Sequence, residues 1–341
     1  MLFLQNGPKE SSRQGVAVII AADVGGTYTR VALFELEGAL KKQEETTFRS
    51  RDYPNLLAII QEYLSSKKVK IKSACFAVAG PIHEGRCKLT NIPDWVVDIH
   101  EFQEALKVSN VILLNDLEAN AWGLGVLAPE DFVLLQKGNP RQLGNAALIS
   151  PGTGLGEAGL YWDGKKFRPF ACEGGHSDFA ARNALEFELF TWLQKKYGHV
   201  SYERVVSGPG LGNIYHFLIE SGHEKENPTI HKEMEEKDPP QVVSIWGKDQ
   251  KDQACTHALE WFLSLYGAEV GNAALKFLAL GGIYLGGGIV PHIVDQMKQG
   301  PFISSFLDKG RFKPLLETIP VRLILNDETA LLGTAAYARR K

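Results

Sequence analysis

The chain has 341 residues, of which 44% are hydrophobic and 23% are charged, and its formal net charge is -3. This length and composition indicate a soluble globular protein with two lobes, and they exclude the disordered, fibrous and membrane-spanning classes. The slightly acidic balance provides no attraction for a nucleic-acid backbone. We therefore expect no nucleic-acid partner and no membrane partner.

The beginning of the chain, residues 1–15, lacks the apolar core of a signal peptide, and we expect it to form a flexible leader. The four cysteines form no CxxC pair, which indicates reduced thiols and no zinc knuckle. Together these features predict a cytoplasmic protein.

Strands and helices alternate in the first part of the chain. An apolar run, Val16 to Ala22, ends in Asp23-Val24-Gly25-Gly26-Thr27, and the chain resumes with Arg30 to Phe34. This pattern predicts a strand, a glycine turn and a returning strand. Further segments predict helices over 55–66 and 101–107 and strands over 71–79 and 111–114. Such alternation is typical of an α/β lobe.

A similar pattern begins at residue 146. A strand over 146–149 leads into Gly152-Thr153-Gly154-Leu155-Gly156 and a further strand over 158–161, which indicates two related halves. The polar segment 221–252 contains Pro239-Pro240 and is expected to be a surface excursion. The remaining patterns predict helices over 185–196, 257–280 and 328–339 and strands over 283–285 and 321–325.

Both glycine turns could bind phosphate. Asp23 ends a strand beside glycines whose N–H groups can approach an anion, and its carboxylate could hold magnesium directly or through water. Gly152-Thr153-Gly154 could form a second phosphate loop, although either turn could be an ordinary hairpin turn. The second turn matches neither a Walker A loop nor a Rossmann fingerprint, because no Lys-Ser or Lys-Thr pair follows and the chain returns as a strand.

Asn115-Asp116 follows a predicted strand, at the end where open α/β sheets place their ligands. The Asp116 carboxylate could accept the proton of a sugar hydroxyl that attacks phosphorus. It could instead cap a helix that starts at Leu117.

The segment Glu173-Gly174-Gly175-His176 places a carboxylate and an imidazole where they could bind adjacent sugar hydroxyls. With Glu203, Asn91 and Asn115 it would supply the polar groups of a hexose pocket. A lone histidine is more often a satisfied surface or core residue, and two ligands make a weak metal site. Gly286-Gly287-Gly288 could admit an adenine or ribose, or could end a strand.

In their order along the chain, these motifs resemble those of bacterial-type glucokinases, within the actin, Hsp70 and sugar-kinase superfamily. The resemblance runs from about residue 17 to the C-terminus. It also includes Leu89-Thr90-Asn91, Ser177-Asp178-Phe179 and Ser207-Gly208-Pro209-Gly210-Leu211. One such motif is a weak signal, whereas the ordered set is specific.

The resemblance implies a two-lobed actin-like (ribonuclease H-like) ATPase fold with an ATP and sugar cleft, its small lobe comprising residues 16–126 and 323–341 and its large lobe residues 127–322. It implies ATP-dependent phosphorylation of D-glucose at the 6-hydroxyl, with glucose and MgATP as partners, by a homodimer. The alternatives are a kinase for another hexose, such as mannose or fructose, and a non-catalytic sugar-sensing regulator.

The resemblance also implies roles for individual residues. Asp116 looks like the catalytic base. The implied sugar ligands are Asn91, Asn115, Asp116, Glu173, His176 and Glu203. The implied nucleotide ligands are Asp23, Gly25, Gly26, Thr27, Gly152, Thr153, Gly154, Gly287 and Gly288. Cys172 and Tyr28 depart from the family pattern, and the zinc-binding cysteine cluster of ROK-type glucokinases is absent from the sequence.

Overall fold

The computed structural model describes residues 17–139 and 141–340, so the predicted leader lies outside the described residues. The chain divides into two compact units. The first contains the described residues up to Val126 and those from Glu328 onward, and the second is Leu127–Asp327. None of the described helices is long and apolar enough to cross a membrane.

The main sheet of the first unit has the strand order β3-β2-β1-β4-β8. β1 (Ala17–Val24) pairs antiparallel with β2 (Tyr28–Glu35), which pairs antiparallel with β3 (Lys42–Arg49). On its other side β1 pairs parallel with β4 (Lys70–Val78), and β4 pairs parallel with β8 (Val111–Asn115). The predicted strand, glycine turn and returning strand after Asp23 are confirmed.

Helices cover both faces of this sheet, because residues of β1 alternate between two apolar clusters. Val18 and Ile20 pack into the cluster that contains residues of α1 and α2. Ile19 and Ala21 pack into the cluster that contains residues of α3 and α12. The bounds of these helices are α1 Leu56–Leu64, α2 Ile99–Leu106, α3 Asp116–Gly123 and α12 Thr329–Ala338.

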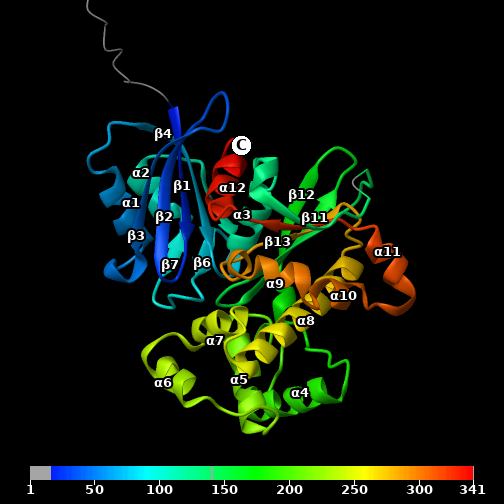
Figure 1. Ribbon diagram of the computed structural model, residues 1–341. Helices are drawn as coiled ribbons and strands as arrows, with labels where there is room; N and C mark the ends of the chain where they lie inside the picture. Colours follow the sequence, from blue (N-terminus) through cyan, green and yellow to red (C-terminus); the bar gives the residue numbers. More distant parts are fainter. Residues whose placement is uncertain (1–16, 140, 341) are drawn as a thin grey trace, which may run out of the picture. The chain divides into compact units, whose positions relative to one another are not determined.

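Close packing of α12 on α3 explains why the last residues of the chain belong to the first unit (Figure 1). A side chain at Gly333 would overlap the carbonyl oxygen of Ala119, and one at Gly123 would overlap that of Thr329. Only glycine allows the helix backbones to approach so closely. Helix α3, whose first residue is Asp116, is therefore held in place by its packing against α12.

A small sheet and a 3-10 turn complete the first unit. The sheet consists of β5 (Ile82–His83), β6 (Arg86–Lys88) and β7 (Val96–Asp98), in that order. The turn η1 (Ser50–Asp52) follows β3. The loop between β6 and β7 contains Asn91.

The main sheet of the second unit has the order β12-β11-β10-β13-β14-β9. As in the first unit, a strand, β10, has an antiparallel partner on one side and a parallel partner on the other, which supports related halves. The bounds are β9 Phe132–Gln136, β10 Ala146–Pro151, β11 Leu155–Trp162, β12 Phe167–Cys172, β13 Gly282–Leu285 and β14 Val321–Ile324.

The core of the second unit forms around the long helix α8 (Gln253–Lys276). Its start is set by Asp252, whose side chain accepts a hydrogen bond from Cys255 N. The helix begins and ends four residues before the predicted 257–280. The other helices are α4 Ala184–Tyr197, α5 Gly208–Glu220, α6 Pro228–Glu236, α7 Pro239–Lys248, α9 Val294–Gln299, α10 Phe302–Leu307 and α11 Lys313–Glu317.

The expected surface excursion over 221–252 is wrong, because α6 and α7 occupy most of it. Each helix begins with proline, whose fixed φ suits the first turn and whose missing N–H costs nothing there. Ile230, Val242 and Val243 are buried in the core. The charged residues that dominate the segment's composition lie on the outer faces of amphipathic helices.

The end of β14 also differs from expectation. The expected small lobe resumes at residue 323, but β14 pairs with β13 and β9 of the second unit. The chain returns to the first unit at Glu328.

Candidate active site

The turn between β1 and β2 is held in shape by a buried serine. Gly25 N donates to Tyr28 O at 3.0 Å, and a side chain at Gly25 would approach that oxygen to 2.7 Å. Ser50 Oγ donates to Gly25 O at 2.8 Å, and Ser50 N donates to Thr27 O at 2.9 Å. Ser50 is not among the residues expected at this site, because nothing in its local sequence links it to a turn that precedes it by a whole hairpin.

Asp23 and Asp116 lie at the same edge of the first sheet. The parallel register places Val24, Val78 and Asn115 in one row across β1, β4 and β8. Because neighbouring strands are about 4.8 Å apart, β1 and β8 are separated by roughly 10 Å. The sheet thus confirms that Asp116 follows the carboxyl end of a parallel strand.

The cap of α3 is Asn115, so the alternative in which Asp116 caps the helix is wrong. Asn115 Oδ1 accepts hydrogen bonds from Leu117 N at 2.9 Å and Glu118 N at 3.2 Å. Asp116 is the first helical residue, and its Oδ1 lies 2.9 Å from Leu117 N. Asn115 uses its oxygen in the cap, which leaves its amide nitrogen to donate to a ligand.

The surroundings of Asp116 include a buried thiol, Cys87. Burial and, secondly, the charge of Asp116 raise the pKa of the Cys87 thiol to about 11. The thiol therefore stays uncharged beside the carboxylate at neutral pH. Burial also raises the pKa of Glu118 in the first turn of α3, against the opposing effect of a hydrogen bond from Trp122.

Asn91 lies against the first glycine turn. A side chain at Gly26 would come within 2.8 Å of Asn91 Cβ, so a glycine is needed where the two loops meet. The loop is tied to the end of β4 by Thr90 N, which donates to Ala79 O at 3.0 Å. Asn91 is exposed, and within residues 17–139 and 141–340 its side-chain amide makes no hydrogen bond. It can bind a polar ligand at this turn.

The second glycine turn joins β10 to β11 and touches the start of α5. Gly152 N donates to Gly154 O at 2.8 Å, and Gly208 N donates to Gly152 O at 2.8 Å. Thr153 is exposed at the tip of the turn. A helix N-terminus beside exposed backbone amides favours an anion. Ser207, which caps α5 through its side chain, belongs to the motif for which the sequence analysis proposed no role.

Glu203 connects this turn with His176. Its Oε2 accepts a hydrogen bond from Leu155 N at 3.0 Å, and a side chain at Gly154 would come within 2.5 Å of the same oxygen. Its Oε1 lies 4.0 Å from His176 Nδ1. The structure therefore brings Glu203, His176 and the second glycine turn together, as the candidate set requires.

Glu173 and His176 flank a 3-10 turn, η3 (Gly174–His176), that rests on β11. A side chain at Gly175 would overlap the carbonyl oxygen of Leu155, which explains the paired glycines. Glu173 is exposed, and nothing in the described part of the chain pairs with its carboxylate. The turn thus presents a carboxylate and an imidazole that can bind neighbouring hydroxyls.

A pocket of about 680 Å³ opens beside the second glycine turn. Gly287 turns the chain at its edge with a φ of 93°, and a side chain there would overlap the carbonyl oxygen of Pro151. Gly288 lines the pocket, and a Cβ atom at Gly288 would meet nothing within 4 Å. The pocket is large enough for a small organic ligand.

One wall of this pocket comes from α7, which the sequence analysis missed. Pro240, Gln241, Ser244, Ile245 and Lys248 line it, together with Thr153, Pro209 and Ile289. The spacing of these α7 residues follows one helical face, and that periodicity was the signal available in the sequence. Ile245 is 49% exposed, so it offers an apolar surface to a ligand.

Within the described residues, no group of three or more histidine, cysteine, aspartate or glutamate side chains could hold a metal ion. A protein-built zinc or calcium centre needs more ligands than Glu173 and His176 provide. Magnesium that arrives on a nucleotide needs only one or two carboxylates, and the position of Asp23 beside a glycine turn suits that mode.

A comparison with family models matches residues 20–341 to the glucokinase family. A glucokinase of Nostoc punctiforme is 38% identical over 95% of this chain and 100% of its own length. Among solved structures, a glucokinase from an Antarctic psychrotroph is 30% identical, with a TM-score of 0.81 over 95% of this chain and 99% of that chain.

A more distant structure shares the fold. A ROK-family glucokinase of Streptomyces griseus, solved with glucose and AMPPNP, is 18% identical and has a TM-score of 0.64 over 95% of this chain and 100% of that chain. These similarities agree with the mixed α/β, two-lobed sugar-kinase fold.

Proposed function

This chain belongs to the glucokinase family and is a glucose kinase, and from that premise we propose that Asp116 is the base that activates the 6-hydroxyl of glucose toward ATP. The observation that carries the proposal is the position of Asp116 at the carboxyl end of β8, with the capping role taken by Asn115. A carboxylate placed in this way can serve a ligand at the sheet edge.

In the proposed reaction, glucose O6 attacks the γ-phosphorus of ATP. A new O–P bond forms as the bond to the bridging oxygen breaks, and ADP leaves. The hydroxyl proton passes to the Asp116 carboxylate. Magnesium bound with ATP supplies positive charge to the phosphates, and Asp23 would hold it, directly or through water.

Glucose hydroxyls would be bound by Glu173, His176 and Glu203, and we propose the same role for Asn91 and Asn115. The exposed Glu173 carboxylate and the amide nitrogen of Asn115 support these roles. A carboxylate accepts from a hydroxyl, whereas an amide nitrogen donates to one, so the set can fix a hexose in one orientation.

The nucleotide would occupy the pocket beside the second glycine turn. Thr153, the backbone of Gly152 and Gly154, and the N-terminus of α5 suit its phosphates. Ile245 and the Gly287-Gly288 segment suit the adenosine. The turn formed by Asp23, Gly25, Gly26 and Thr27 is also proposed to bind phosphate. The family resemblance also supports a cytoplasmic homodimer in glycolysis.

A panel of hexoses tests the proposed reaction. With MgATP, we expect glucose to give the highest kcat/KM and mannose, fructose and glucosamine to give lower values, since a hydrogen-bonding site discriminates epimers. Coupled ADP release measures each rate, and NMR of the product identifies the phosphorylated oxygen. Turnover without sugar dependence, or phosphate on another hydroxyl, would contradict the proposal.

Two glycines with positive φ provide a matched test of the nucleotide pocket. Gly287→Ala should raise the KM for ATP more than about tenfold, because the new methyl group overlaps Pro151 O and φ is positive. Gly164→Ala should leave it within about twofold, because its φ of 90° is similar but a Cβ atom there meets nothing within 4 Å and Gly164 does not line the pocket. Glucose affinity measured without nucleotide should be the same in both. Equal ATP constants for the two variants would place the nucleotide elsewhere.

A further inference from the structure

Two buried glutamates lie behind the candidate sugar-binding residues and take no part in the proposed reaction. Glu157 of β11 is 2% exposed and Glu269 of α8 is 0% exposed. Their carboxyl groups lie close enough to form a hydrogen bond with each other. Carboxylates accept but do not donate when ionised, so this bond requires a proton on one of them.

The donors around the pair decide which glutamate carries the proton. Glu269 Oε2 accepts a hydrogen bond from Asn272 Nδ2 at 2.8 Å, and its Oε1 lies 3.5 Å from Lys276 Nζ. Within the described residues, no donor reaches the buried Glu157 Oε1. The negative charge is therefore stabilised on Glu269, and the proton resides on Glu157.

Glu157 lies directly under the turn that carries Glu173 and His176. A side chain at Gly174 would overlap Glu157 Oε2, so the carboxyl group touches the backbone of the turn. Glu157 is also paired in register with Cys172, the residue before Glu173. A change of charge at Glu157 would therefore directly change the electrostatic interaction between this carboxyl group and the backbone of the turn.

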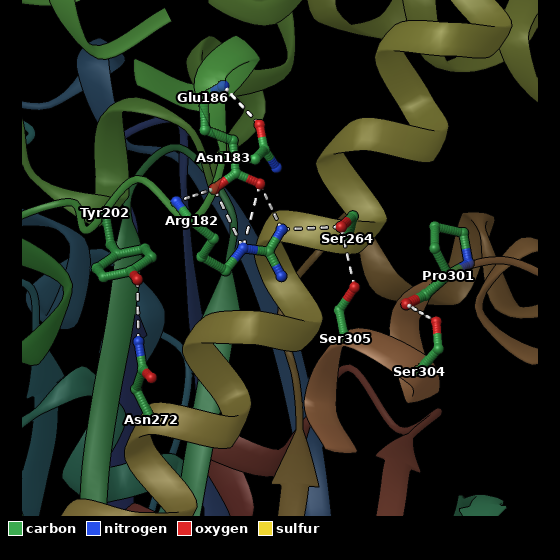
Figure 2. A network of polar contacts seen from close by, with 9 residues as sticks. All are labelled: Arg182, Asn183, Glu186, Tyr202, Ser264, Asn272, Pro301, Ser304 and Ser305. Atoms are coloured by element: carbon green, nitrogen blue, oxygen red, sulfur yellow. Dashed lines mark hydrogen bonds and ion pairs between the residues drawn. The ribbon is translucent and has the colours of Figure 1, made fainter. Parts of the chain in front are cut away.

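The same buried network reaches the other sugar-binding segment. Figure 2 shows Asn272 of α8, whose Nδ2 donates to Tyr202 Oη at 2.9 Å. Tyr202 immediately precedes Glu203, and Tyr202 N donates to Ser177 O at 3.0 Å. Asn272 Oδ1 is itself occupied by Lys309 Nζ at 2.7 Å. The segments that carry Glu173 and Glu203 thus rest on one set of fixed contacts.

We propose that Glu157 is a positioning residue for glucose binding: its proton, donated to Glu269, supports the turn that carries Glu173 and His176, and its loss displaces that turn. The inference rests on the sugar-binding roles assigned under the proposed function. Ionisation of Glu157 would place two negative charges side by side in the buried pair. Their repulsion would displace the least constrained neighbour, which is the exposed turn that carries Glu173 and His176.

Burial, and then the charge of Glu269, raise the pKa of Glu157 to about 8, whereas Lys276 opposes this shift. Burial likewise raises the pKa of the Cys172 thiol and that of Tyr266. The titratable groups that face the pair are Cys172 of β12, Tyr202 of η4, Tyr266 and Lys276 of α8, and Lys309 after α10.

Glucose binding without nucleotide, measured by calorimetry between pH 6 and 9.5, tests the proposal. The wild-type dissociation constant should rise by about tenfold from pH 7 to pH 9, the limit in which only the protonated form binds. Glu157→Gln keeps a neutral donor toward Glu269, so its affinity at pH 7 should match wild type and stay flat at high pH. Glu260→Gln, on the exposed face of α8, should keep the wild-type profile.

A wild-type profile in Glu157→Gln would overturn the proposal, because the titrating group would then lie elsewhere. An infrared difference spectrum of wild type minus Glu157→Gln, recorded in the absence of sugar, tests whether Glu157 is protonated. A protonated carboxylic-acid carbonyl band at pH 7 that disappears at pH 9 supports the assignment, and its absence contradicts it. If the band is present but Glu173→Ala binds glucose with wild-type affinity, then the proposed sugar ligands are wrong, whereas the assignment of the proton to Glu157 still holds.

Discussion

Asp116→Asn should lower kcat for glucose phosphorylation by about a thousandfold, within the range that a positioned general base contributes. The amide keeps the size of the side chain and can still accept from Leu117 N, so α3 should begin as before. It cannot take a proton from glucose O6. Glucose affinity without nucleotide should change by much less than kcat, because the effect belongs to the transition state. Coupled ADP release and calorimetry measure the two quantities.

The matched control is Glu118→Gln, in the same turn of α3. Its amide oxygen can still accept the hydrogen bond from Trp122 Nε1, which lies 3.3 Å from Glu118 Oε1. We expect its kcat to stay within about threefold of wild type, because Glu118 has no role in the proposed reaction. A variant at Asp116 that retains wild-type kcat, or equal losses in both variants, would remove Asp116 from the role of base.

Glu173→Ala and Glu203→Ala should have different effects on the two substrates. Loss of a hydrogen bond to a charged group costs about 1.5 to 3 kcal/mol, so Glu173→Ala should raise the KM for glucose about tenfold to a hundredfold. Its KM for ATP should not change. Glu203→Ala should raise both constants, since Glu203 also holds Leu155 N in the second glycine turn. Initial rates over a grid of both substrates measure them.

A control for the second prediction is Glu188→Ala. Glu188 lies on α4 of the same unit and pairs with His223 at 3.0 Å, and both side chains are exposed. Surface pairs of this kind contribute little, so both Michaelis constants should remain at wild-type values. If Glu203→Ala changed only the constant for glucose, the link through Leu155 would have no role in nucleotide binding. If neither variant changed it, the sugar site would lie elsewhere.

Local sequence signals predicted most strands and several helices accurately. Apolar runs that ended in glycine turns identified β1 and β10, and both returned as strands because glycine permits the tight turn. Local signals failed to predict the two helices within residues 221–252, because the polar composition of this segment hides their helical spacing. The Pro239-Pro240 pair predicts a break in the chain, whereas Pro239 begins α7, because proline is favoured in the first helical turn.

The candidate residues were also found unevenly. Asp116 was recognised by its position after a strand, which sequence pattern can show. Ser50, which holds the first glycine turn, and α7, which lines the pocket, came from segments with no visible relation to those turns. Asn115 was taken as a sugar ligand alone, whereas its oxygen caps α3.

The sequence by itself determined the order of the motifs, the family they resemble and the residue types available for phosphoryl transfer, because glycines, strand ends and caps are local properties of the chain. The tertiary structure alone decided which of these residues meet. Glu203 reaches Leu155 N, and Glu157 reaches Glu269 under the turn of Glu173, across long stretches of chain. Such contacts depend on strand register and helix packing, and these set both the burial and the charge of each carboxylate.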